Sequence, residues 1–131
     1  LPRLYAWAGT FLAAPETDIE PEAADLLLLA LTESVTNIMR HGYEGASGKP
    51  IAIFAAACLD RLVFEIEDEG IPWTYEPAPD PAFDGSKSGG FGLFIIDQVM
   101  DRRLHLRLPN GRNRLQLTRF RNHQNPTENT P

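Results

Sequence analysis

The sequence predicts an α+β fold, in which helices cover one face of an antiparallel or mixed β-sheet. Two observations lead to this prediction. The expected elements follow the order helix, helix, strand, strand, long loop, helix, strand, strand, so strands come in pairs and do not alternate singly with helices. The chain has 131 residues, enough for one domain with its own core. We therefore expect a two-layer sandwich over residues 1–121, followed by a disordered polar tail over residues 122–131.

Two helices are expected before the first strand. Residues 4–12 place apolar side chains at helical spacing. Residues 15–20 then read as a linker. Pro21 suits the first turn of a second helix, which continues to about His41 and ends at Gly42.

Two strands follow, and the second places a carboxylate on the core face. Residues 51–59 are apolar on both faces, which favours a central strand. Residues 62–67 alternate, with the inward set Leu62, Phe64 and Ile66 and the outward set Val63, Glu65 and Glu67. Since Asp68 continues the period of two, its carboxylate should face the core. A carboxylate there needs hydrogen-bond donors.

The second half of the chain is expected to contain a long loop, a helix and a hairpin. Residues 72–88 contain four prolines and no periodicity, which indicates a loop, and residues 93–100 form an amphipathic pattern. Leucines then alternate on both sides of a turn at residues 109–111, which predicts a closing hairpin. These leucines are Leu104, Leu106, Leu108, Leu115 and Leu117.

Composition and charge exclude several classes of protein. The net charge is −6, which argues against direct nucleic-acid binding because phosphate contacts need clustered Lys and Arg. Cys58 is the single cysteine, so neither an internal disulfide nor a Cys/His metal cluster is expected. The longest apolar run is too short to span a bilayer, and no signal peptide is visible. We therefore expect a cytoplasmic protein that binds no membrane.

The second helix carries a polar stripe opposite its apolar side. Glu33, Asn37 and His41 follow one another at i, i+4 and i+8, and such positions drift by only about 40° per step around a helix. The stripe combines a carboxylate, a carboxamide and an imidazole, whereas an ordinary solvated face more often mixes Lys and Glu. Taken alone, the stripe is equally compatible with an exposed surface without a function.

A glycine-rich segment precedes the third helix. Gly89, Gly90 and Gly92 let the backbone approach a ligand closely, and the N–H groups at a helix N-terminus can bind phosphate. Taken alone, such a segment is also ordinary turn chemistry. It lacks the Lys of a P-loop and the preceding strand of a dinucleotide-binding fold.

Three polar side chains add chemistry to this segment. The Asp68 carboxylate could accept a hydrogen bond from the exocyclic amine of a purine, or it could simply cap a turn. The Asn37 carboxamide offers a neutral oxygen to Mg²⁺, which typically takes one or two protein ligands beside phosphate and water. Glu33, one helical turn earlier, could orient or deprotonate a nucleophile beside the terminal phosphate.

In their order and spacing, these residues resemble the N, G1 and G2 boxes of the GHKL ATPase superfamily. The likeness is strongest to the small bacterial anti-sigma-factor serine/threonine kinases and extends over about residues 25–120. The positions that carry it are Glu33, Asn37, His41, Gly42 and Tyr43, then Asp68 and Gly70, then Gly90, Gly92 and Leu93. The resemblance implies a Bergerat-type fold that binds ATP or ADP with Mg²⁺.

The resemblance also implies a role for individual residues. Glu33 would be the catalytic base or water-positioning carboxylate, and Asn37 would hold the metal. Asp68 would recognise adenine, and Gly70 would let the base approach. The other nucleotide-binding positions that it implies are Arg40, His41, Lys87, Ser88, Gly89, Gly90, Phe91, Gly92 and Leu93. Residues 72–88 would form a lid, with Lys87 or Ser88 at the terminal phosphate.

The function implied is that of an ATP-binding anti-sigma factor with serine/threonine kinase activity. Its partners would be a sigma factor and the antagonist protein that it phosphorylates, and the resemblance allows a homodimer. Two alternatives remain open. The chain could be a nucleotide-gated binding module without phosphate transfer. It could also be the ATP-binding domain of a larger histidine kinase or phosphatase-linked regulator.

Overall fold

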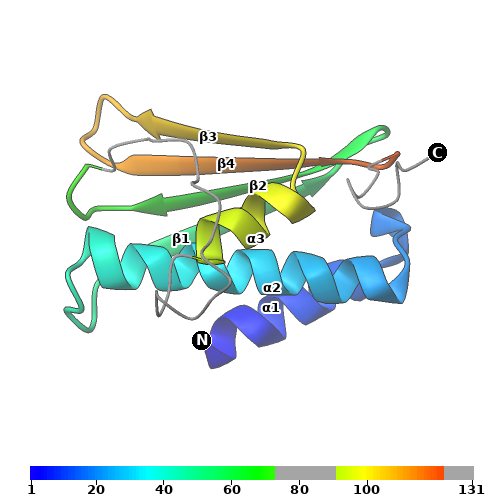
Figure 1. Ribbon diagram of the computed structural model, residues 1–131, viewed down its shortest axis with the longest axis horizontal. Helices are drawn as coiled ribbons and strands as arrows, with labels where there is room; N and C mark the ends of the chain where they lie inside the picture. The colour runs from blue at the N-terminus through cyan, green and yellow to red at the C-terminus, as the bar shows by residue number, and fades with distance from the viewer. Residues whose placement is uncertain (73–90, 123–131) are drawn as a thin grey trace.

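The computed structural model describes residues 1–72 and 91–122 and forms two layers (Figure 1). One layer is a four-stranded antiparallel sheet in the order β1-β2-β4-β3, and helices cover one of its faces. The helices are α1 (Pro2–Ala13), α2 (Pro21–Asn37) and α3 (Phe91–Val99). The strands are β1 (Ile51–Ala57), β2 (Arg61–Asp68), β3 (Arg102–Arg107) and β4 (Asn113–Phe120). The predicted α+β sandwich is therefore confirmed, with an antiparallel sheet in the described residues.

Helix α2 runs along the sheet and carries Glu33 and Asn37 of the polar stripe, whereas His41 lies beyond its end. Pro21 and Glu22 in its first turn favour this start, because proline lacks the N–H that would be unpaired and a carboxylate suits the positive helix end. Its buried apolar residues recur at helical spacing and include Leu27, Leu31 and Val35. The helix continues into a π-helical turn over Ile38–Gly42, where the Tyr43 N–H donates to the Ile38 carbonyl at 2.9 Å.

The prediction that the first strand is central in the sheet is wrong. Among the described residues, β1 pairs only with β2 and forms an edge of the sheet. Its side chains Ile51 and Ile53 pack on the core, while Phe54 on the opposite face is 54% exposed. The outward neighbours Ala52 and Ala56 are small. Apart from Phe54, the outer face of β1 therefore exposes little apolar surface, although the strand contains no charged residue.

Strand β2 confirms the predicted inward set, whose members Leu62, Phe64 and Ile66 are buried. Glu67 points outward, as predicted, but it is shielded from solvent. It lies opposite Arg114 across the sheet, on the face away from the helices, but it is only 9% exposed. One of its carboxylate oxygens lies 3.5 Å from Arg114 Nη2, so a neighbouring guanidinium covers it.

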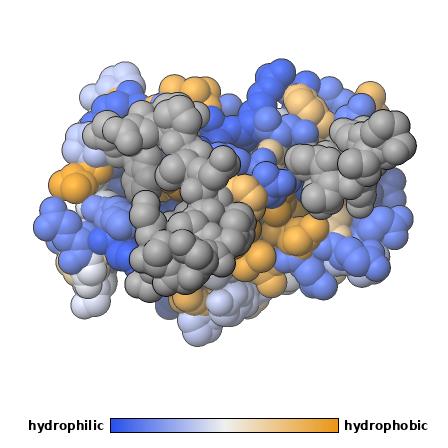
Figure 2. Space-filling model, viewed as in Figure 1, coloured by the Kyte–Doolittle hydropathy of each residue, from blue (hydrophilic) through white to orange (hydrophobic). Residues whose placement is uncertain are grey.

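Strand β3 forms the predicted hairpin with β4, and its leucines lie on the face away from the helices. Leu104 and Leu106 are 48% and 38% exposed. Residues paired directly across a sheet share a face, and Arg103 and His105 pair with the buried Leu117 and Leu115. The polar side chains of this edge strand therefore face the helices. Figure 2 shows a mixed surface on one side of the molecule, with apolar groups among hydrophilic ones.

The linker between α1 and α2 contains a 3₁₀ turn, Pro15–Thr17, that is fixed to the sheet. Just past the end of β4, the Arg121 guanidinium donates hydrogen bonds to the carbonyls of Glu16, Thr17 and Cys58. It thereby joins the linker to the β1–β2 connection. None of the helices in the described residues is long and apolar enough to cross a membrane.

Candidate nucleotide-binding site

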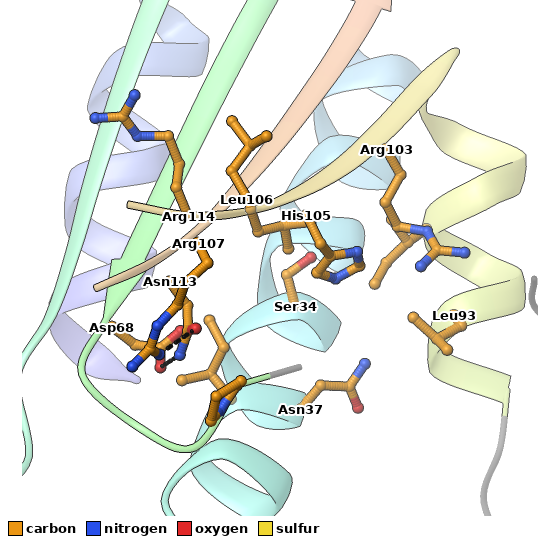
Figure 3. Close-up of a pocket in the computed structure, with 14 residues that line it drawn as sticks. Ser34, Asn37, Asp68, Leu93, Arg103, His105, Leu106, Arg107, Asn113 and Arg114 are labelled. Carbon is orange, nitrogen blue, oxygen red and sulfur yellow. Dashed lines mark hydrogen bonds between the residues drawn. The ribbon is translucent and has the colours of Figure 1, made fainter. Parts of the chain in front are cut away.

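A cavity of about 210 Å³ lies between the helices and the sheet (Figure 3). Its walls come from α2, α3, β2, β3 and β4, which are distant in the sequence. The apolar part of the lining includes Ile38, Leu93, Ile96 and Leu115. The polar part includes Ser34, Asn37, Asp68, Arg103, His105, Arg107 and Asn113. An apolar pocket with a few polar groups is the usual form of a small-molecule site.

Asp68 lies in the cavity wall at the end of β2 and is 6% exposed. Its Oδ1 accepts hydrogen bonds from the Gly70 N–H at 2.8 Å and from Asn113 Nδ2 at 3.0 Å. The predicted position of this carboxylate on the core face, with donors to stabilise it, is confirmed.

The turn after Asp68 is packed against the end of α2. A Cβ atom at Gly70 would lie 2.4 Å from the Gly42 carbonyl oxygen, and that oxygen accepts the Ile71 N–H at 2.9 Å. The Tyr43 hydroxyl accepts the Glu69 N–H at 2.7 Å. Only glycine can lie this close to the Gly42 carbonyl, so the position of the turn after Asp68 depends on Gly70.

Gly70→Ala is expected to lower the free energy of unfolding by about 1–3 kcal/mol, because its methyl group would overlap backbone atoms that cannot move independently. Chemical denaturation measures this loss. Gly9→Ala in α1 is the control, since no heavy atom lies within 4 Å of its Cβ position. Equal stability of the Gly70 variant and the wild type would show that the turn at Gly70 can move away from Gly42 without loss of stability.

Glu33 and Asn37 lie together against the first turn of α3. A Cβ atom at Gly92 would lie 2.9 Å from Glu33 Oε2 and 3.4 Å from both terminal atoms of the Asn37 amide. Both side chains are half-buried, and within the described residues neither makes a side-chain hydrogen bond. The helix face that they share therefore presents oxygen atoms to a ligand.

The other predicted positions lie in different surroundings. Leu93 lines the cavity, and Phe91 begins α3. Arg40 and His41 are exposed in the π-helical turn, where the spacing of an α-helix no longer holds. The proposed lid beyond Pro72 lies outside the described residues, as do residues 123–131 and the positions Lys87, Ser88, Gly89 and Gly90.

The sequence analysis missed the polar face of β3. Arg103 is nearly buried and forms two hydrogen bonds with Asp97 of α3, at 2.6 and 2.8 Å. The pKa of His105 is lowered to about 4, mainly by burial and also by the nearby Arg103, against the opposing effect of Asp97 and Asp68. The imidazole is therefore neutral at pH 7. Polar residues alternating with the leucines of this segment were the available signal.

The available oxygen atoms suit Mg²⁺ bound with a nucleotide. The described residues contain no cluster of three or more His, Cys, Asp or Glu that could hold a metal. Mg²⁺ usually keeps waters and binds through one or two protein oxygens together with substrate phosphates. Asn37, beside the Glu33 carboxylate, fits that requirement as a single protein ligand.

Comparison with known proteins identifies the family of the chain. Residues 1–119 match the family described as the histidine kinase-like ATPase domain, so the chain belongs to this family. The resemblance to GHKL ATPases and to anti-sigma-factor kinases is confirmed. Membership in an ATPase family implies binding of ATP or ADP.

Two kinds of relative illustrate the similarity. The chain is 33% identical over 97 residues to an anti-sigma F factor of Clostridium perfringens, and this alignment covers 71% of the chain and 68% of the relative. It is 31% identical over 103 residues to the serine-protein kinase RsbW of Staphylococcus aureus, covering 72% of the chain and 63% of that relative.

Proposed function

We propose that the protein is an ATP-binding anti-sigma regulatory factor that phosphorylates a serine or threonine of an antagonist protein. The observation that carries this proposal is the placement of Glu33 and Asn37 against Gly92, beside a cavity that Asp68 lines. In this proposal, the Asp68 carboxylate binds the base of the nucleotide, and the Asn37 amide binds the metal at its phosphate end. The catalytic carboxylate lies next to the phosphate end.

The nucleotide would enter with its base toward Asp68. The exocyclic amine of adenine donates a hydrogen bond, and the Asp68 carboxylate accepts one. The phosphates would then lie near Asn37 and the start of α3, where backbone N–H groups and the helix dipole favour anions. Mg²⁺, held by Asn37 and the phosphates, would neutralise charge on the transferring group.

Glu33 would act on the protein substrate. The serine or threonine hydroxyl attacks the terminal phosphorus of ATP, the bond to the ADP oxygen breaks, and the hydroxyl proton passes to the Glu33 carboxylate. Glu33 shares its helix face with Asn37, so the same rigid element positions base and metal. A module that only binds nucleotide does not need a carboxylate there.

The partners follow from the similarity to relatives named for anti-sigma activity and serine kinase activity. We propose a sigma factor and its antagonist as partners, a homodimer as the assembly and the cytoplasm as the location. The net charge of −6 supports control of transcription through proteins and not by direct contact with nucleic acid. Residues 1–121 would form the ATPase domain, with residues 122–131 as a polar tail.

Nucleotide binding is the first test. ADP or ATP with Mg²⁺ is expected to raise the melting temperature, since a ligand at 100 times its Kd stabilises the native state by about 2.7 kcal/mol. Asp68→Asn should weaken ADP by about ten-fold or more, because an amide cannot accept all the hydrogen bonds that the carboxylate accepts. Calorimetry measures both effects. Absence of ADP and ATP binding at millimolar concentration would reject the proposed function.

A further inference from the structure

Three side chains face one another across the cavity end of the sheet. The strand register pairs Asp68 of β2 with Asn113 of β4, and Asn113 with Arg107 of β3. Paired residues share a face, so the three form a row across three strands. All three line the cavity, and Figure 3 shows them grouped on one side of it.

The orientation of the Asn113 amide is fixed by its neighbours. Its Nδ2 lies 3.0 Å from Asp68 Oδ1, 3.1 Å from the Gly70 carbonyl and 3.2 Å from the Ile71 carbonyl, all of them acceptors. Its Oδ1 accepts from Arg107 Nη1 at 2.8 Å, and a guanidinium can only donate. A flipped amide would face acceptors with its oxygen and a donor with its nitrogen. Arg107 therefore determines which end of the amide reaches Asp68.

This arrangement determines which Asp68 oxygen can meet a ligand. Among the described residues, the hydrogen bonds to the carboxylate both go to Oδ1, one from Asn113 and one from Gly70. Asn113 also contacts the Gly70 and Ile71 carbonyls, so it fixes the turn as well as the carboxylate. Oδ2 is then left as an acceptor with a fixed direction.

We propose that Asn113, oriented by Arg107, is a positioning residue that sets the base preference of the cavity, an inference that rests on the proposed nucleotide binding. By fixing the direction of Asp68 Oδ2, it favours a purine that carries an exocyclic amine. It rejects a purine with a carbonyl at that position, because two acceptors would face each other.

The test compares ADP with inosine diphosphate, in which a carbonyl replaces the exocyclic amine. Calorimetry with Mg²⁺ and the full chain gives the ratio of the two dissociation constants. The wild type should prefer ADP, and Asn113→Ala should reduce that preference by about ten-fold, mainly through weaker ADP binding. Asn113→Ser keeps one hydroxyl donor and should restore part of the preference.

Arg107→Met is the second variant, because it removes the donor that orients the amide and leaves Asn113 in place. It should reduce the ADP preference in the same direction. Arg102→Met is the matched control on the same strand. Arg102 lies on the opposite face, with its guanidinium 5.1 Å from the Phe120 ring centroid, so its removal should leave the preference unchanged.

The outcomes distinguish failure of the inference about Asn113 from failure of the proposed function. If Asn113→Ala and Arg107→Met weaken both diphosphates by the same factor, Asn113 has only a structural role and the inference is wrong. A wild type that binds ADP and inosine diphosphate equally overturns the inference while the proposed function stands. A wild type that binds neither rejects both. If Asn113→Ala does not fold, an unchanged preference in Arg107→Met overturns the inference and a reduced one supports it.

Discussion

Glu33→Gln is expected to slow phosphate transfer to the antagonist protein by about 10²–10⁴-fold, the usual effect of removing a positioned base, and to leave ATP affinity within a few-fold. The amide keeps the size of the side chain beside Gly92 but cannot take the hydroxyl proton. Transfer from labelled ATP to the antagonist measures the rate, and calorimetry measures the affinity.

Two further variants make this result specific. Asn37→Ala should lose Mg²⁺-dependent binding and transfer together, because the proposed role of this side chain is to hold the metal that bridges to the phosphates. Glu22→Gln is the matched control, since it removes an exposed carboxylate from the first turn of the same helix. Transfer at the wild-type rate by Glu33→Gln would remove the catalytic role and leave the nucleotide-gated binding module as the function.

The sequence predicted correctly those features that depend on one element with one covered face. Strict alternation in β2 placed Asp68 toward the core because a period of two leaves no other direction. Helical spacing likewise placed Glu33 and Asn37 on a common face of α2. In both cases, local geometry alone determines where the side chain lies.

The wrong prediction concerns the edge strand β1, and the direction in which the side chains of edge strand β3 face was not predicted, because hydropathy is a poor guide to burial at a sheet edge. At β1, small alanines tolerate exposure on the outer face, so an apolar run did not require two covered faces. At β3, the face toward the helices borders a cavity, where Arg103 finds the Asp97 carboxylate and His105 remains neutral. Leu104 therefore lies on the exposed face.

Asn113 could not be recognised from the sequence for a different reason. Its partners belong to β2, β3 and the turn after β2, and the strand register alone brings them within hydrogen-bond distance. An asparagine after a turn is otherwise an ordinary residue at the start of a strand.

Gly92→Ala is expected to reduce the rate of phosphate transfer by about 10²-fold, since a small misplacement of a catalytic group has effects of that size. The new Cβ would lie 2.9 Å from Glu33 Oε2, well inside ordinary contact. The neighbour is the end of a flexible side chain, so the carboxylate can move aside. We therefore expect the free energy of unfolding to change by less than about 1 kcal/mol.

A double variant tests whether Gly92 acts through Glu33. If the alanine slows transfer by displacing the carboxylate, Glu33→Gln combined with Gly92→Ala should be no slower than Glu33→Gln alone, since residues that act as a unit have non-additive effects. Transfer kinetics of the wild type, both single variants and the double variant complete this cycle. Independent, multiplicative losses would show that Gly92 acts through Asn37 or the phosphates and that its contact with Glu33 has no part in catalysis.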